Sequence, residues 1–160
     1  MVPKLQSTRI HVVTGLLERD GCVLLVASRY PNHREPIWNL PGGRQREGEL
    51  LAETLRREFL EETSLAVTVG GLCYVAESYD VEGGAHVLVC CFAVTATGAV
   101  KLGAGDAHAV GVAWVPRADI ASRVTVPVVR DPLLAHLAGN PARYYGYATS
   151  GITIEFADPP

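Results

Sequence analysis

The sequence predicts a single α/β domain in which a mixed β-sheet carries helices on both faces. Several short apolar runs rich in Val, Leu and Ile have the length of strands, and one longer segment free of Gly and Pro has the composition of a helix. The 160 residues are enough to bury one core without disulfides. No repeat, low-complexity segment or linker divides the chain, so residues 1–160 are expected to form one domain.

The first elements are expected to be strands. Residues 9–17 and 22–27 are apolar runs separated by a turn with an Asp-Gly pair, a pattern that predicts a β-hairpin. Residues 30–36 (YPNHREP) contain two prolines and predict a loop. A short strand is expected at residues 38–40, and it must end at the Pro-Gly-Gly sequence of residues 41–43.

Residues 49–62 predict the main helix. The segment contains no Gly or Pro, is dominated by Leu, Ala, Glu and Arg, and has acidic residues at its start, where the helix dipole favours them. The elements expected after it are strands at residues 65–75 and 86–94, a Gly-rich loop at 97–109, a strand at 111–115, short helices at 116–122 and 131–138, and a late strand at 144–156.

Composition indicates an ordinary soluble globular protein without a general affinity for nucleic acid. Apolar residues make up 48% of the chain and charged residues 19%, while the net charge is -3 and the pI is about 5.9. A protein of negative charge that handles phosphates needs a local positive device, either basic side chains or bound cations.

The apolar runs are too short for a signal peptide or a membrane span, so no membrane partner is expected. The four cysteines lie inside apolar runs and form no CxxC pair, which favours buried thiols in a reducing compartment. We therefore expect a cytoplasmic protein. The oligomeric state stays open, a homodimer included.

The expected helix places carboxylates on its apolar side. At 100° per residue, Leu51, Leu55 and Phe59 define a buried stripe about 80° wide. Glu62 projects between the first two of these residues, and Glu58 lies about 20° outside Leu51. Like charges at i and i+4 repel, and negative charge is unfavourable near a helix C-terminus. This arrangement favours a divalent metal site, with a solvated acidic surface as the alternative.

The same residues resemble the Nudix box. In this motif, Gly-x5-Glu-x7-Arg-Glu-U-x-Glu-Glu-x-Gly-U, U is a bulky apolar residue. Gly43, Glu49 and the run from Arg57 to Leu65 match eight of the nine specified positions. A chance match of this quality is on the order of one in a million or rarer. The flanking segments, the hairpin at 12–27 and the sequence Ala-Trp-Val-Pro at 113–116, extend the similarity over residues 8–120, whereas the chain beyond about residue 131 is not covered.

The resemblance implies a Nudix-type α/β/α sandwich with a mixed sheet, and a metal-dependent hydrolase that cleaves a nucleoside diphosphate linked to another moiety. It implies Mg²⁺ or Mn²⁺ bound by Glu58, Glu61 and Glu62, with the Gly43 carbonyl as a further ligand. Glu58 is also the candidate base or its orienting group. Arg57 is expected to hold the glutamates by ion pairing, and Glu49 to support Arg57 or an outer shell of the metal.

Two positions depart from the pattern of the family. Ser64 stands where the family has glycine, and a left-handed conformation there would cost about 1 kcal/mol. Many relatives also have another glutamate a few residues before the late tryptophan. Alanine occupies that position here, so either Asp106 substitutes for the glutamate or Glu58 is the only base.

The substrate is less well defined by the sequence. Subfamilies specific for ADP-ribose often have a proline some fifteen residues after the box, where this chain has Tyr79 and Asp80. A nucleoside triphosphate or a nucleotide-sugar-like molecule is therefore the default small-molecule substrate. Tyr79 and Arg29 are candidate contacts. Tyr30, His33 and Arg34 of the Arg29 loop could also contact phosphate or base, with a merely solvated loop as the alternative. The alternative function is a Nudix-fold regulator that binds a nucleotide without cleaving it.

Overall fold

In the computed structural model, residues 8–156 are described. The sequence-based expectations for residues 1–7 and 157–160 lie outside this range. The strands are β1 (Thr8–Leu16), β2 (Glu18–Arg19), β3 (Cys22–Ser28), β4 (Ile37–Asn39), β5 (Gly42–Arg44), β6 (Thr68–Asp80), β7 (Ala85–Thr95), β8 (Ala109–Pro116) and β9 (Tyr144–Tyr147). The helices are α1 (Leu51–Thr63), the short 3₁₀ helix η1 (Arg117–Asp119), α2 (Ile120–Arg123) and α3 (Pro127–Leu137).

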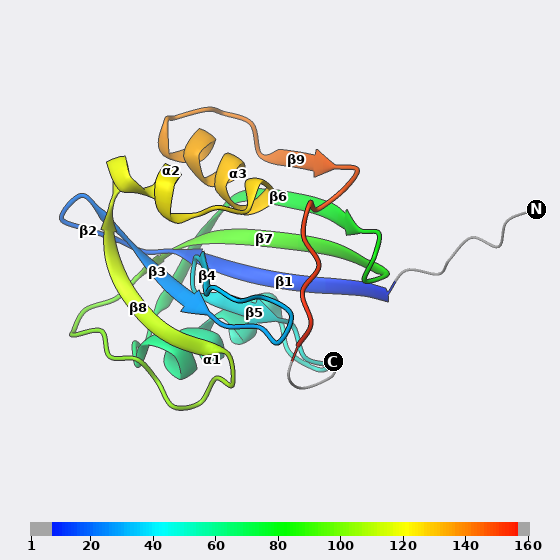
Figure 1. Cartoon of the computed structure of the whole chain (residues 1–160). Coiled ribbons are helices and arrows are strands. Elements are labelled where there is room, and N and C mark those ends of the chain that lie inside the picture. Colours follow the sequence, from blue (N-terminus) through cyan, green and yellow to red (C-terminus); the bar gives the residue numbers. More distant parts are fainter. Residues whose placement is uncertain (1–7, 157–160) are drawn as a thin grey trace, which may run out of the picture.

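The strands form two sheets. The first has the order β5-β1-β7-β6-β9; β1 is parallel to β7 and β6 is parallel to β9, so this sheet is mixed, as predicted. In the second, β3 pairs antiparallel with β2, β4 and β8. Figure 1 shows α1 on one side of the five-stranded sheet and α2 and α3 on the other. The predicted α/β/α sandwich is therefore confirmed, although the sequence did not indicate the second sheet.

The first predicted hairpin is much shorter than expected. Asp20 and Gly21 form a turn with positive φ angles of 51° and 75°, but the turn joins only the two-residue strand β2 to β3. The preceding strand, β1, pairs with β5 and β7 instead. Two consecutive strands therefore diverge into separate sheets just after Leu17.

The burial of β3 on both faces explains why its sequence is almost continuously apolar. Val23 and Leu25 belong to a core that also contains residues of α2 and α3, whereas Leu24 belongs to the core under α1. A strand covered on both faces loses the usual alternation of polar and apolar residues. This strand thus links the two halves of the core.

Several predicted boundaries were wrong, and β6 runs on to Asp80, five residues beyond the expected end at residue 75. β6 begins at Thr68 rather than at residue 65, because the buried Leu65 and Val67 fill the core beneath α1 before the strand starts. Helix α3 begins at Pro127, four residues early, since proline is well tolerated in the first turn of a helix. The late strand β9 ends at Tyr147, and residues 148–156 continue without regular structure apart from turns and bends.

Helix α1 positions the candidate site. Leu55 and Phe59 are fully buried, and the helix is anchored at its start by Glu53, whose Oε2 accepts a hydrogen bond from the Leu50 N–H at 2.6 Å. At the other end Ser64 has φ 62° and ψ 15°, which confirms the left-handed conformation that the sequence led us to expect.

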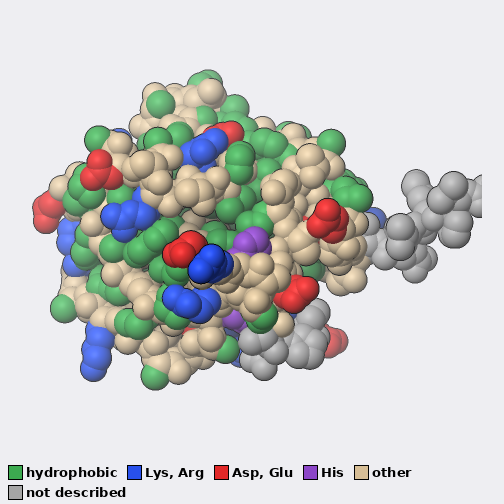
Figure 2. Space-filling model, viewed as in Figure 1, with side chains coloured by type: hydrophobic (Ala, Val, Ile, Leu, Met, Phe, Trp, Pro, Cys, Tyr) green, Lys and Arg blue, Asp and Glu red, His purple; other side chains and the backbone are tan. Residues whose placement is uncertain are grey.

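The visible face of the molecule carries charges of both signs, scattered between apolar side chains (Figure 2). This distribution agrees with the small net charge of -3. None of the helices in residues 8–156 combines the length and the apolar character needed to cross a membrane.

Candidate metal centre and phosphate site

Two carboxylates of α1 turn inward. Glu58 and Glu62 are one helical turn apart, so both side chains lie on the same face. Their exposed fractions are only 7% and 4%, which places both among the buried residues. The inward position inferred from the helical wheel is therefore observed.

Glycines of β5 make room for these carboxylates. The Gly42 N–H donates a hydrogen bond to Glu62 Oε1 at 2.9 Å. A Cβ atom at Gly43 would lie 2.4 Å from Glu58 Oε1, much closer than real contacts allow. The glycines that precede the helix in the sequence thus let the backbone of β5 lie directly against both glutamates.

A third carboxylate comes from the loop between β7 and β8. The Lys101 and Gly103 N–H groups donate hydrogen bonds, both 3.0 Å long, to the carbonyls of Thr63 and Glu62 at the end of α1. This loop therefore satisfies acceptors that the helix leaves free, and it is fixed to the helix end. Its continuation brings Asp106 close to α1.

Asp106 is held by its own backbone turn. Its Oδ1 accepts hydrogen bonds from the N–H groups of His108 at 2.6 Å and Ala109 at 2.9 Å, just where β8 begins. Local bonds of this kind are characteristic of aspartate in turns, and they fix the orientation of the carboxylate.

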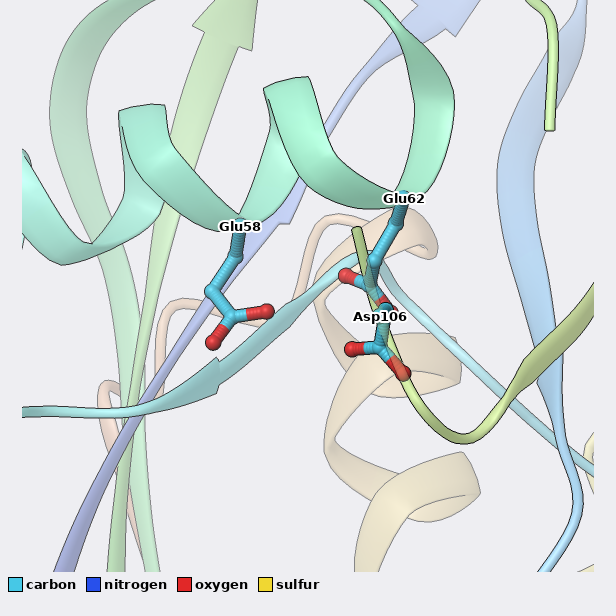
Figure 3. Close-up of side chains that lie close together, drawn as sticks. All are labelled: Glu58, Glu62 and Asp106. Atoms are coloured by element: carbon cyan, nitrogen blue, oxygen red, sulfur yellow. The ribbon is translucent and has the colours of Figure 1, made fainter. Parts of the chain in front are cut away.

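The three carboxylates converge, as Figure 3 shows. One carboxylate oxygen each from Glu58, Glu62 and Asp106 can be chosen so that all three lie within 4.8 Å of one another. Oxygen ligands of this kind suit Mg²⁺ and Mn²⁺, and a divalent cation would balance the clustered charge. The side chains present therefore fit a hard divalent metal.

Electrostatics also favour a cation in this position. Burial raises the pKa of Glu58 to about 7, against the opposing effect of Arg57, and the nearby carboxylates of Glu61 and Asp106 add to the rise. Burial likewise raises the pKa of Glu62 well above its ordinary value, although the Gly42 N–H opposes this. Buried carboxylates without a full complement of positive charge are costly to ionise.

Arg57 links the glutamates of the motif. Its Nε and Nη2 donate to the two carboxylate oxygens of Glu49 at 2.7 and 2.9 Å, a bidentate pair. Its Nη1 lies 2.9 Å from Glu58 Oε1 and 3.4 Å from Glu61 Oε2. A planar guanidinium can make all of these contacts at once, whereas an ammonium cannot.

Glu49 and Glu61 have different surroundings from the inward pair. The hydrogen bond from Arg57 lowers the pKa of Glu49 to about 2, and the same carboxylate also accepts bonds from the Arg46 N–H and the Thr54 hydroxyl. The Glu61 carboxylate contacts Arg57 and is not part of the three-carboxylate cluster.

The other two candidates from the sequence lie outside the cluster. The Arg29 N–H donates to the His108 carbonyl at 2.9 Å, so its backbone adjoins the segment that carries Asp106. Tyr79 lies at the tip of the β6–β7 hairpin, with its ring stacked on His86 at a centroid distance of 4.2 Å. Its role as a substrate contact stays a prediction.

Four side chains pack together beside the cluster, and of these only Tyr30 was a candidate from the sequence. Tyr30 and His108 have ring centroids 5.1 Å apart, and Phe156 packs edge-on against both. Arg44 follows Gly43 and lies over the Phe156 ring. Only chain folding brings these four residues together, because they come from four distant segments.

The fold and the carboxylate site together define a class of protein. The model of the NUDIX domain matches residues 7–137 of this chain, which is most of its length. The chain therefore belongs to the Nudix family, as the box at residues 43–65 led us to expect.

Two characterised relatives are similar over parts of the chain. An ADP-ribose pyrophosphatase of Methanocaldococcus jannaschii is 36% identical over 94 residues, which cover 59% of this chain and 54% of that protein. A CTP pyrophosphohydrolase of Escherichia coli is 34% identical over 61 residues, 38% of this chain and 45% of that protein. The matches thus span about half the length of these relatives.

Solved structures share the fold over nearly the whole chain. A NUDIX hydrolase from Nitrosomonas europaea has a TM-score of 0.72 at 24% identity and covers 86% of this chain and 93% of its own. A MutT protein from Methanosarcina mazei gives 0.71 at 25% identity, covering 86% and 99%. The Escherichia coli ORF135 protein gives 0.69 at 23% identity, covering 88% and 99%.

Proposed function

We propose that the protein is a metal-dependent pyrophosphohydrolase that cleaves a phosphoanhydride bond in a nucleotide. The observation that carries the proposal is the convergence of Glu58, Glu62 and Asp106 at the end of the Nudix helix. Buried like charges at this position do not stabilise the fold. A divalent cation would be bound by all three carboxylates and could in turn bind a phosphate chain.

The side chains have separate roles in this proposal. Glu58, Glu62 and Asp106 would hold Mg²⁺ or Mn²⁺, which supplies charge neutralisation and activates water when it is bound. Glu58 would also accept the proton of the attacking water or orient that water, as the resemblance implies. Glu61 and the Gly43 carbonyl are further candidate ligands, as the resemblance implies.

Arg57 and Glu49 act as support for the ligands. The bidentate pair between them fixes the guanidinium, which in turn contacts the carboxylates of Glu58 and Glu61. Side chains that orient ligands in this way preserve the geometry on which the chemistry depends.

The substrate we propose is a nucleoside triphosphate. The resemblance to the CTP pyrophosphohydrolase supports this choice, and the lack of any proline between Pro41 and Pro116 argues against specificity for ADP-ribose. The resemblance to the ADP-ribose pyrophosphatase, which covers more of the chain, makes ADP-ribose the second compound to examine.

The test is a panel of nucleoside triphosphates, nucleotide sugars and ADP-ribose, incubated with the protein and Mg²⁺ and assayed for phosphate, pyrophosphate and nucleoside monophosphate. We expect turnover of at least one nucleoside triphosphate. Absence of turnover across the panel, with tight nucleotide binding retained, would instead indicate a non-hydrolytic regulator.

A further inference from the structure

The segment of residues 148–156, here called the C-terminal strap, is fastened across the molecule. In Figure 1 it runs from β9 past β1 toward β5. Its start is tied to the tip of the β6–β7 hairpin, where the Ser150 N–H donates to the Tyr79 carbonyl at 2.6 Å and the Thr153 hydroxyl donates to Asp80 Oδ1 at 2.7 Å. The strap is thus an ordered part of the fold.

The second half of the strap is tied to the loop before the Nudix box. Asn32 donates from its side-chain amide to the Thr153 carbonyl at 2.6 Å and accepts from the Glu155 N–H at 2.9 Å. His33 Nε2 lies 2.7 Å from the same Thr153 carbonyl. On the strap these bonds use only backbone atoms of Thr153 and Glu155, so they hold the segment just before Phe156 independently of the strap's own side chains.

Phe156 lies against Arg44. The guanidinium carbon is 4.0 Å from the centroid of the Phe156 ring, which is a close cation–π contact. The rings of Tyr30 and His108 also pack against Phe156, each with its ring centroid 5.8 Å from that of Phe156. The strap therefore limits the positions that the Arg44 guanidinium can take.

The Arg44 guanidinium has an unused donor. Its Nη1 is the one buried side-chain nitrogen or oxygen without a hydrogen-bond partner in the described part of the chain. A buried N–H of a charged group is costly unless an acceptor meets it, and arginine presents such donors most effectively to phosphate oxygens. Residues 8–156 provide no acceptor for this donor, and a phosphate oxygen is an acceptor that suits it.

Arg44 is also close to the carboxylate cluster. It directly follows Gly43, which contacts Glu58. Burial raises the pKa of the Tyr30 phenol and a hydrogen bond with Ser28 opposes the rise; Glu62 and Asp106 raise the pKa further and Arg44 lowers it, so these three charges are near enough to act on one phenol. An anionic oxygen bound by Arg44 would therefore lie close to a cation held by the carboxylate cluster.

We propose that the C-terminal strap completes the substrate site, with Phe156 as a positioning residue that holds Arg44 for an anionic oxygen of the phosphate chain. This inference rests on the proposed function, since it assigns a contact to the same nucleotide. It gives the C-terminal strap a role in binding, although the strap lies beyond the region that matches the family.

The test is a double-mutant cycle on Arg44 and Phe156, read out as the Kd of a non-hydrolysable α,β-methylene nucleoside triphosphate in the presence of Mg²⁺. Phe156→Ala should weaken binding roughly two- to thirtyfold, the range of a cation–π contact. Phe156→Leu should bind as weakly, because it keeps the bulk but lacks the ring face, whereas Phe156→Tyr should bind as wild type does.

The decisive comparison uses the Arg44→Ala background. If Phe156 acts through Arg44, adding Phe156→Ala there should change the Kd little further. An equal loss in both backgrounds, or no loss from Phe156→Ala alone, would overturn the proposal. Glu155→Ala is the control, because the Glu155 side chain is exposed and its backbone bond to Asn32 remains.

Kinetics separate this inference from the proposed function. For a hydrolysed nucleotide, Phe156→Ala should raise KM with kcat within about twofold of wild type. If no nucleotide is hydrolysed, the proposed function fails, while the cycle of Kd values still decides whether the strap acts through Arg44.

Discussion

At the scale of single residues, Glu58 and Glu62 occupy positions that helix packing would give to apolar side chains. Each has one polar partner that partly compensates for burial: Arg57 for the first and the Gly42 N–H for the second. Glutamine at either position keeps the volume and an acceptor oxygen but removes the charge. The two substitutions thus separate the electrostatic role of these residues from their packing.

We predict that Glu58→Gln and Glu62→Gln each lower kcat by roughly a hundredfold or more, the scale of losing a positioned base or metal ligand. Without metal, both variants should melt at or above the wild-type temperature, because charge repulsion near a helix C-terminus is relieved by at least about 0.5 kcal/mol and the cost of ionising a buried carboxylate at higher pH is removed as well. The measurement is kcat with Mg²⁺ beside thermal melting in chelator. Variants that melt well below wild type and stay active would show that the glutamates are structural.

Arg57→Lys is predicted to lower catalytic activity severely although it retains the positive charge. Lysine cannot reproduce the bidentate pair with Glu49 while also contacting Glu58 and Glu61. We expect a loss in kcat of at least about tenfold with a folded protein, since displaced supporting groups typically cost 10–100-fold. Circular dichroism and steady-state kinetics provide the check, and near-normal kinetics would mean that Arg57 is an ordinary surface charge.

The sequence predicted the inward glutamates because helical periodicity alone fixes which face a residue occupies. Asp106 could only be suggested, since its position depends on how the loop of residues 97–109 closes onto α1 through Lys101 and Gly103. Arg44 and Phe156 could not be paired at all, because no local rule connects β5 with the end of the chain.

At the scale of elements, the C-terminal end of α1 has a strained backbone residue and is hydrogen-bonded to the loop between β7 and β8. Ser64 adopts a left-handed conformation at the position where the Nudix box specifies glycine, and its hydroxyl donates to the Lys101 carbonyl at 2.9 Å. That exposed bond links the helix end to the loop that delivers Asp106. This hydrogen bond therefore offsets part of the free-energy cost of the left-handed backbone at Ser64.

Ser64→Gly is predicted to stabilise the protein by up to about 1 kcal/mol, reduced by the loss of the exposed bond to Lys101. Catalysis should change little, because the N–H groups of Lys101 and Gly103 still hold the loop. Thermal melting and kcat measured together test this expectation. A lower melting temperature would show that the hydroxyl outweighs the strain.

Element types were more predictable than strand partners. The main helix and the strands at β3, β7 and β8 were recognisable from periodicity and from their flanking turns. The pairing of β1 with β7 instead of β3 was not, because the pattern of one strand does not record which neighbour it chooses. The segment beyond Tyr147 was wrongly predicted as strand, since its backbone makes only isolated bonds, to the Tyr79 carbonyl and to the side chains of Asn32 and His33, and no continuous strand pairing.

At the scale of the whole molecule, three carboxylates in one buried place make stability depend on pH. The charged groups that act on Glu58 are Arg57, which lowers its pKa, and Glu61 and Asp106, which raise it, but burial has the largest effect. The folded pKa of about 7 lies above the ordinary value of 4.5. Stability from this group is therefore fully present below about pH 4.5 and is lost as pH rises through about 7.

We predict that the metal-free protein becomes less stable between about pH 5 and about pH 8, by up to about 3 kcal/mol from Glu58 alone. Glu58→Gln should reduce this dependence of stability on pH. Addition of Mg²⁺ to the wild-type protein at the upper pH should restore the stability that it has lost. Thermal melting across the range in chelator is the measurement. A melting temperature that rises steadily with pH would contradict the electrostatic account of the cluster.

We propose that hydrolysis depends on a cation held by the carboxylates of α1 and the Asp106 loop. The rate of nucleotide hydrolysis, measured in excess EDTA and after Mg²⁺ or Mn²⁺ is restored, tests this dependence. We expect turnover to disappear with the chelator and to return with either metal. Undiminished turnover in excess EDTA would contradict it.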